Sequence, residues 1–400
     1  MGVSVGAVGV VGAGTMGAGI AQLALEAGHR VLLHDIDAAA IERGRTRIRA
    51  GLERRAARLD LDAEAAGSWV AHRLDRLGDA PTIDDLAGAN PGFIIEAALE
   101  DLAAKRAIFR ALDAATAPTT ILATNTSALS VAAIAEATTD PGHVLGLHFF
   151  NPAPVMPLVE VVVAPATNPA IADRATALMT AWGKVPVHCT DAPGFIVNRV
   201  NRPFTLEALA ILAEGGATIE TIDTALRAAG FPMGPFELMD LVGLDVSLAT
   251  TRGVFAGSVA AGDLAADRFR PSPVQERLVA AGLLGRKSDA GFYDYDEAGR
   301  AIGPTPEFDR SHGPAARPTD GEIVTRITLA VVNEAYRVAG ERVATPADID
   351  LAMRLGASHP SGPFERAADL GGPRAVLDAL RAFARDGPRF EPAPALHAPG

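Results

Sequence analysis

The sequence predicts an α/β fold in which a doubly wound, mostly parallel sheet is followed by two tandem all-helical domains. In the first half, short apolar runs alternate with stretches of helical periodicity. The runs lack strict polar alternation, which is typical of strands covered on both faces. After about residue 190 we expect strand-like runs to stop and helices to take over, with an internal repeat that divides the helical half in two.

The individual elements follow from these patterns. Apolar runs predict strands at 5–11, 31–34, 92–95, 120–124, 144–149, 158–163 and 185–189. Helical periodicity predicts helices at 16–27, 38–58, 102–115 and 169–182, with a helical-pair insertion near 38–78. Six glycines interrupt the apolar start, and no basic residue precedes it, so we interpret residues 1–28 as folded structure and not as a targeting segment. No membrane span is expected.

Composition shifts predict the domain boundaries. We expect a first domain at 1–190, a helical domain at 191–295, a Gly- and Pro-rich linker at 296–320 and a second helical domain at 321–400. The residues after about Arg385 are Pro-rich and are expected to form a loosely held tail.

The two helical domains are expected to be copies of one unit. The segment Gly194–Arg199 resembles Gly321–Arg326, and Gly234–Glu237 matches Gly362–Glu365, at an offset of 127 or 128 residues. The second copy lacks the equivalents of Phe195 and Asn198. Duplicated helical units commonly pair about a pseudo-twofold axis, so we expect an internal pseudo-dimer, with a homodimer of chains as the alternative.

Composition also limits the function. The chain has 400 residues, a formal net charge of −12 and one cysteine, Cys189. The acidic balance argues against a nucleic-acid partner. A single cysteine excludes an internal disulfide or a cysteine-based metal site and fits a reducing compartment, so we expect a cytoplasmic protein. The histidines show no ligand spacing, and no metal site is expected.

A glycine-rich segment marks a candidate cofactor site. It follows the first predicted strand, opens a helix and reads Gly12-Ala13-Gly14-Thr15-Met16-Gly17. In that context the pattern is typical of a Rossmann-like, dinucleotide-binding domain, in which the helix N-terminus faces the pyrophosphate. Asp35 ends the second predicted strand, where a carboxylate binds ribose hydroxyls and repels a 2′-phosphate. The sequence therefore favours NAD over NADP.

Candidate catalytic residues lie at the ends of predicted strands, where ligands bind in open α/β sheets. His148 ends one strand, and Glu160 is a carboxylate inside an otherwise apolar run. A buried carboxylate needs a partner, and His148 is the simplest one. A carboxylate on one ring nitrogen fixes the tautomer, so that the other nitrogen can exchange a proton with a substrate hydroxyl. Ser127 lies in a third segment of this kind.

Together these segments resemble the L-3-hydroxyacyl-CoA dehydrogenase family over about residues 5–295. The motifs that carry the resemblance are Gly12–Gly17, Asn125–Leu129, His148–Pro152, Glu160, Pro193–Arg199 and Gly234–Glu237. The resemblance implies reversible oxidation of a (3S)-hydroxyacyl-CoA by NAD. It implies that His148 is the general base and Glu160 its orienting partner, and that Ser127 and Asn198 hold the reacting oxygens, in a cleft between domains. Cofactor contacts are implied at Gly12, Gly14, Thr15, Met16, Gly17, Asp35, Glu100, Lys105, Asn125, Ser127, Asn151 and Lys287.

A run of arginines indicates where coenzyme A binds. Arg47, Arg54 and Arg58 share one face of the predicted helix 38–58, and a positive face on an acidic protein suits a phosphate-rich ligand. Arg54 and Arg58 are the candidate CoA contacts. Gly51 stands where the family has a serine, so the match is loose here.

Two alternatives remain at this stage. One is an NAD enzyme acting on a free hydroxy acid or sugar acid, which would not need the arginine face. The other is a non-catalytic nucleotide-binding protein. Neither the acyl chain length nor the pathway, whether β-oxidation or another branch of fatty acid or aromatic metabolism, follows from the sequence.

Overall fold

A computed structural model describes residues 6–308 and 318–397. The chain divides into two units, Met1–Ala192 and Pro193–Gly400, which are described in turn. The division falls two residues beyond the expected boundary.

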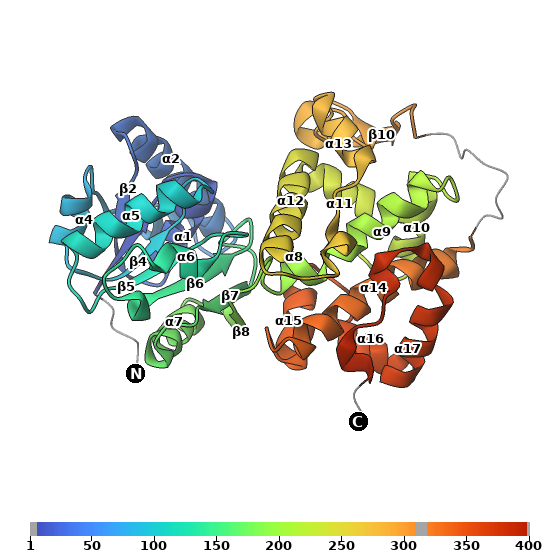
Figure 1. Cartoon of the computed structure of the whole chain (residues 1–400). Coiled ribbons are helices and arrows are strands. Elements are labelled where there is room, and N and C mark those ends of the chain that lie inside the picture. Colours follow the sequence, from blue (N-terminus) through green and yellow to red (C-terminus); the bar gives the residue numbers. More distant parts are fainter. Residues whose placement is uncertain (1–5, 309–317, 398–400) are drawn as a thin grey trace. The chain divides into compact units, whose positions relative to one another are not determined.

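Unit 1 is built on an eight-stranded sheet of order β3-β2-β1-β4-β5-β6-β7-β8 (Figure 1). All neighbouring strands are parallel except β6 and β7. The predicted doubly wound, mostly parallel sheet is thus confirmed. The strands are β1 (Ala7–Val11), β2 (Arg30–His34), β3 (Leu77–Asp79), β4 (Pro91–Glu96), β5 (Ile121–Thr124), β6 (Val144–Phe149), β7 (Leu158–Val163) and β8 (Val185–Thr190).

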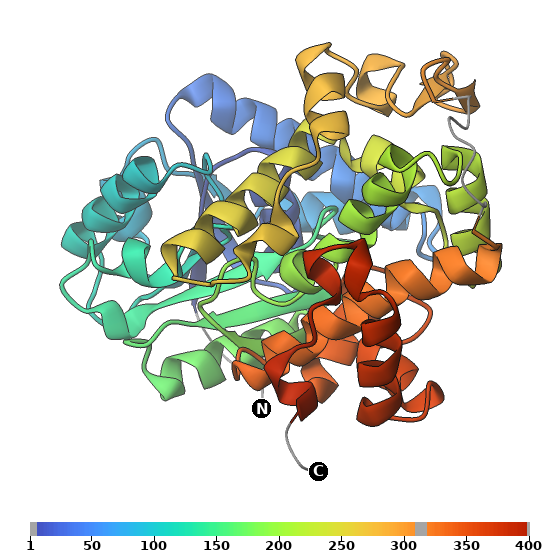
Figure 2. The ribbon, with the colours of Figure 1, turned by 45° about the vertical axis from the view of Figure 1, so that its right-hand side comes forward.

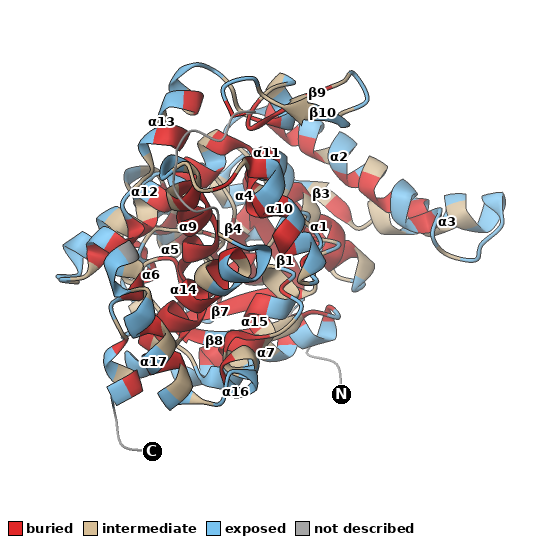
Figure 3. Cartoon of the chain, turned by 90° about the vertical axis from the view of Figure 1, so that its right-hand side faces the viewer, coloured by how far each residue is buried: buried red, intermediate tan, exposed pale blue. Residues whose placement is uncertain are grey.

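Helices cover both faces of this sheet. They are α1 (Thr15–Glu26), α2 (Ala38–Ala56), α3 (Ala63–Leu74), α4 (Ile83–Gly88), α5 (Leu102–Ala115), α6 (Val131–Ala135) and α7 (Pro169–Ala181). Alternate residues of β1 face opposite ways: Val8 and Val10 join the core shared with α1, α2 and α7, whereas Gly9 lies against Leu86 of α4. Burial on both faces explains why the strands read as continuous apolar runs, and Figure 3 shows them buried.

Unit 2 carries the two helical copies, in green to yellow and in orange to red (Figures 1 and 2). The first has α8 (Val197–Val200), α9 (Arg202–Ala213), α10 (Ile219–Ala228), α11 (Pro235–Val242), α12 (Leu244–Ala260) and α13 (Pro273–Ala280). The second has α14 (Asp320–Gly340), α15 (Pro346–Gly356), α16 (Pro363–Asp369) and α17 (Pro373–Ala382).

The same local contact recurs in both copies. Asp223 accepts hydrogen bonds from the backbone amides of Phe236 and Glu237, and Asp350 accepts them from Phe364 and Glu365. In each copy an atom of the aspartate side chain lies 2.2 Å from the position that a Cβ on the helix-capping glycine, Gly234 or Gly362, would take. Only glycine therefore fits there. The repeated Gly-Pro-Phe-Glu sequence therefore encodes a repeated helix N-terminus.

The two copies contact each other through reciprocal ion pairs. Arg199 donates to Glu334 (Nε–Oε1 2.8 Å) and to both oxygens of Glu341. Their equivalents 127 residues away do the same: Arg326 donates to Glu207 (Nε–Oε1 2.6 Å) and to both oxygens of Glu214. Arg268 adds a second pair to Glu334, and Arg389 adds one to Glu207. Such reciprocity is what a twofold interface produces.

Two expectations are wrong, and one short strand, β3, was not predicted. Strand structure does not stop after residue 190, because β9 (Tyr293–Tyr295), at the end of the expected first helical domain, pairs with β10 (Ala301–Pro304) in the expected linker. The hydroxyl groups of Tyr293 and Tyr295 donate to buried Asp223 and Asp240 and so hold this hairpin. The C-terminal segment 388–397 is not a loose tail, because Phe390 and Leu396 are buried in the second copy. Residues 309–317 of the expected linker lie outside the described residues.

Glu334 tests how much the reciprocal pairs stabilise unit 2. Its carboxylate is buried between Arg199 and Arg268, and removing one partner of a buried ion pair costs about 3–5 kcal/mol. We expect Glu334→Gln to lower the free energy of unfolding by that amount in urea titrations followed by circular dichroism. Glu276→Gln, in an exposed pair with Arg252, should cost less than about 1 kcal/mol. Equal effects of the two substitutions would contradict this account.

Candidate active site

A histidine and a glutamate face each other across β6 and β7. The antiparallel register pairs His148 with Glu160, and the histidine Nδ1 lies 2.5 Å from Glu160 Oε2. Both side chains are buried, and the ring of Phe150 lies 4.6 Å from the imidazole ring, centroid to centroid. A carboxylate bound to Nδ1 fixes the tautomer and stabilises the imidazolium form, so the arrangement suits a general base that acts through Nε2.

A loop after β5 lies next to this pair. Asn125 accepts a hydrogen bond from the backbone amide of Phe149, the neighbour of His148 (2.8 Å). Two residues later, Ser127 donates its backbone amide (2.8 Å) and its hydroxyl (3.2 Å) to Glu100 Oε1. Asn125, Ser127 and Glu100 lie close together because they follow the carboxyl ends of the adjacent parallel strands β5 and β4.

A buried charge network lies behind this loop. Lys105 is buried and donates to Glu96 Oε1 at 2.7 Å, with Glu100 Oε2 at 3.4 Å. Thr124 donates to the other oxygen of Glu96. Burial raises the pKa of Glu100, but the charge of Lys105 and hydrogen bonds from Thr126 and the loop amides outweigh it, and the pKa of this carboxyl lies below its usual value. Glu100 therefore links Lys105, with which it forms an ion pair, to the backbone of the loop that carries Ser127.

Glu96 was not among the sequence-based candidates. The signal that singled out Glu160 was available for it as well, because Glu96 follows directly on the apolar run 92–95 and is fully buried. A carboxylate that ends a buried strand needs a partner, and here the partner is Lys105.

The glycine-rich loop joins β1 to α1 where the strand order reverses between β2 and β4. A Cβ at Gly12 would lie 2.6 Å from the carbonyl oxygen of Ala97, and one at Gly17 would lie 1.7 Å from that of Gly12. The space beside Gly14 is open to 4 Å, and α1 begins without a side-chain cap. Its first amide groups thus suit a phosphate group, and the residues fit a bound dinucleotide.

Asp35 ties the end of β2 to this loop. Its Oδ2 accepts from the amide of Ala13 and its Oδ1 from that of Ile36, both at 2.7 Å. The carboxylate is thereby fixed beside the loop, in the position from which it can bind ribose hydroxyls.

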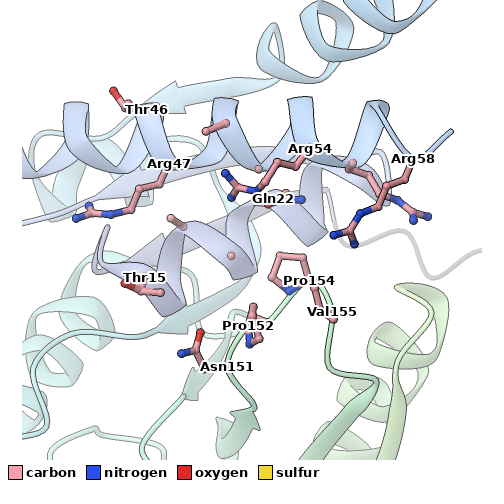
Figure 4. A pocket seen from close by; sticks show the side chains of 16 residues that line it. Thr15, Gln22, Thr46, Arg47, Arg54, Arg58, Asn151, Pro152, Pro154 and Val155 are labelled. Carbon is pink, nitrogen blue, oxygen red and sulfur yellow. The ribbon is translucent and has the colours of Figure 1, made fainter. Parts of the chain in front are cut away.

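A cavity of about 760 Å³ opens between α1, α2 and the loop 150–157. Figure 4 shows Arg47 and Arg54 of α2, and Arg58 just after its end, along one wall, with Asn151 on the opposite side. Thr15 also lines it. The structure explains why position 51 is a glycine where the family has a serine. Gln22 Oε1 lies 2.0 Å from where a Cβ at Gly51 would stand. The glutamine therefore occupies the space that a serine side chain would need.

Lys184 anchors the far wall of this cavity. Its buried Nζ donates to the carbonyl oxygens of Ala153 (2.6 Å) and Met156 (2.8 Å) in the loop 150–157. Burial lowers the pKa of Lys184 to about 8, and Glu26 opposes the shift. No local sequence pattern predicted this contact.

Two predicted residues belong to unit 2. Asn198 lies in α8. Lys287 lies in the short turn Arg286–Ser288, and its Nζ is 2.5 Å from Asp245 Oδ1. Their predicted contacts with cofactor and substrate stay predictions. In the described part of the chain, no group of three or more His, Cys, Asp or Glu side chains is arranged to hold a metal ion, and no helix is long and apolar enough to span a bilayer.

Comparison with known proteins agrees with this geometry. The family model of the 3-hydroxyacyl-CoA dehydrogenase NAD-binding domain matches residues 7–192, and that of the C-terminal domain matches 194–295 and 321–398. The chain belongs to the 3-hydroxyacyl-CoA dehydrogenase family. It is therefore an NAD-dependent oxidoreductase of this type, and the predicted resemblance and cofactor are confirmed.

Several relatives of this family are similar over most of their length. The 3-hydroxyadipyl-CoA dehydrogenase of Escherichia coli (strain K12) is 38% identical, with 92% of each chain covered. A probable 3-hydroxybutyryl-CoA dehydrogenase of Bacillus subtilis (strain 168) is 39% identical over 72% of this chain and 96% of that one. The crystal structure of 3-hydroxybutyryl-CoA dehydrogenase from E. coli K12 matches with a TM-score of 0.86 and 36% identity over 98% of both chains.

Proposed function

We propose that the enzyme reversibly oxidises a (3S)-hydroxyacyl-CoA to the 3-oxoacyl-CoA. The observation that carries this proposal is the buried pair of His148 and Glu160, 2.5 Å apart, at the sheet edge where parallel strands end. When bound, NAD supplies the acceptor for the hydride that leaves C3. His148 Nε2 takes the proton of the 3-hydroxyl group, and Glu160 stabilises the imidazolium ion that results.

Ser127 and Asn198 hold the reacting oxygens in this proposal. Both side chains can hydrogen-bond a hydroxyl or a carbonyl oxygen without adding a full charge. Glu100 accepts hydrogen bonds from the backbone amides of Ser127 and Ala128. These contacts hold Ser127 in a defined position, which supports its proposed role. Asn198 comes from α8 of unit 2.

Gly12, Gly14, Thr15, Met16 and Gly17 would hold the pyrophosphate of NAD on the α1 N-terminus, with Asp35 on the adenine ribose. Asn125, Asn151 and Lys287 are further contacts in this proposal. Glu100 and Lys105 would act on the cofactor side through the Ser127 loop, because Lys105 is buried against Glu96.

The arginine-lined cavity is the proposed site of coenzyme A. Arg54 and Arg58 are exposed and line it together with Arg47, and guanidinium groups are well suited to phosphates. A free hydroxy acid has one carboxylate and no phosphates to match several arginines, which favours an acyl-CoA over the alternative substrate.

We propose further that the internal pairing of the two helical copies replaces a homodimer. The reciprocal pairs of Arg199 with Glu334 and of Arg326 with Glu207 support this idea. Sedimentation equilibrium should give the mass of one chain; a mass of two chains at micromolar concentration would refute it.

The catalytic pair is tested by substitution. With 3-hydroxybutyryl-CoA as substrate and NADH absorbance as readout, we expect His148→Ala to reduce kcat by about 10²–10⁴-fold and Glu160→Gln by at least about 10²-fold, because a positioned base contributes that much. His143→Ala alters a surface histidine that also pairs with a carboxylate, Asp140, and should retain full activity. A His148→Ala variant as active as the parent, or an inactive parent, would exclude the proposal.

The coenzyme A site is tested with a double substitution. We expect Arg54→Ala with Arg58→Ala to raise KM for the acyl-CoA about tenfold or more, mainly without loss of kcat, since each charged hydrogen bond contributes about 1.5–3 kcal/mol at most. Arg43→Ala on the same helix, exposed and outside the cavity, is the matched control. An unchanged KM in the double variant would place coenzyme A elsewhere.

A further inference from the structure

Unit 2 contains a buried arginine without a carboxylate partner. Arg202 is the first residue of α9 and is 7% exposed. Its guanidinium makes one hydrogen bond among the described residues, a long one of 3.3 Å from Nη1 to Thr251 Oγ1. Its Nε is buried and has no acceptor. Thr251 donates its own hydroxyl proton to the carbonyl oxygen of Ser247, so it offers Arg202 a lone pair and no charge.

The other buried arginines of the described part of unit 2 are different. Arg199 and Arg268 bind Glu334 directly, and Arg337 is within electrostatic range of Glu334 and Glu391. For Arg202, burial lowers the pKa to about 10 and no neighbouring charge opposes this shift, yet the group is still protonated at neutral pH. A buried, unpaired charge is costly to a folded protein, which indicates that it serves something other than stability.

The position of Arg202 relates it to the substrate. Residues 197–200 form α8, Asn201 keeps a helical conformation and α9 follows, while the amide of Asn201 bonds to the carbonyl of Val197. Arg202 therefore lies one helical turn after Asn198, on the same side and about 6 Å along the axis. Asn198 is the residue that the proposed function assigns to the reacting end of the acyl chain.

We propose that Arg202 binds a carboxylate at the far end of the acyl chain, and that the preferred substrate is a short 3-hydroxyacyl-CoA whose chain ends in a second carboxylate. This inference rests on the proposed function. A planar guanidinium matches a carboxylate with two parallel hydrogen bonds, whereas a methyl-ended chain would leave the charge unpaired. In the proposed function the phosphates of coenzyme A already have a site at the wall formed by Arg47, Arg54 and Arg58.

The test compares two six-carbon substrates that differ only at the end of the chain, 3-hydroxyadipyl-CoA and 3-hydroxyhexanoyl-CoA. Selectivity is the ratio of their kcat/KM values. We expect the parent to prefer the carboxylate-ended substrate and Arg202→Met to reduce the selectivity by about 10–100-fold, as expected for loss of a charged hydrogen-bond pair. Arg202→Lys should retain part of the selectivity.

Arg337→Met is the matched control, because Arg337 is also buried with an Nε that lacks an acceptor; its selectivity should equal that of the parent. The thermal midpoint of Arg202→Met should be unchanged or higher, since an apolar side chain replaces an unpaired charge. A purely structural arginine would instead lower the midpoint and leave the selectivity unchanged.

The outcomes separate this inference from the proposed function. A parent that oxidises both substrates equally, or prefers the methyl-ended one, overturns the role of Arg202 and leaves the dehydrogenase assignment intact. A parent that oxidises neither, nor 3-hydroxybutyryl-CoA, overturns the assignment itself. If Arg202→Met fails to fold, inhibition of the parent enzyme provides the test. We expect the inhibition constant of adipyl-CoA to be at least about tenfold lower than that of hexanoyl-CoA. Equal inhibition constants would refute the inference.

Discussion

The hydrogen bond between His148 and Glu160 depends on one feature of the sheet, the reversal of direction between β6 and β7. In antiparallel strands the two residues are directly opposite each other, so their side chains lie on the same face and within reach. The loop 150–157 that allows this reversal also forms one wall of the arginine-lined cavity, and Lys184 anchors it. One topological feature thus pairs His148 with Glu160 and forms one wall of the arginine-lined cavity.

Both units contain buried charged side chains. A buried charge with a partner of opposite sign has a structural role, whereas one without such a partner is a candidate ligand contact. Lys105 is satisfied by Glu96 and Glu100, and Arg199 by Glu334 and Glu341. These groups are paired, so they order a loop and an interface between helical copies. Arg202 has no such partner among the described residues, and for this reason we propose a ligand for it.

The duplication in unit 2 brings two similar helical copies into contact through reciprocal ion pairs. Because Arg199 and Arg326 are equivalent, as are Glu207 and Glu334, each copy provides both the cation and the anion of the interface. Residues that are 127 positions apart in the sequence therefore exchange places in the two ion pairs, as a pseudo-twofold axis produces.

Local patterns in the sequence determined much of this protein. The glycine-rich turn with Asp35, the apolar strands and the lone carboxylate at Glu160 each depend on neighbours within a few residues or on a single burial rule, so they could be recognised directly. The tertiary structure alone decided the rest. The unpaired state of Arg202, the anchoring of a loop by Lys184, the hairpin of β9 and β10 and the packed segment 388–397 all depend on residues distant in sequence. Burial and charge pairing are properties of the assembled fold, and for that reason no local pattern could reveal them.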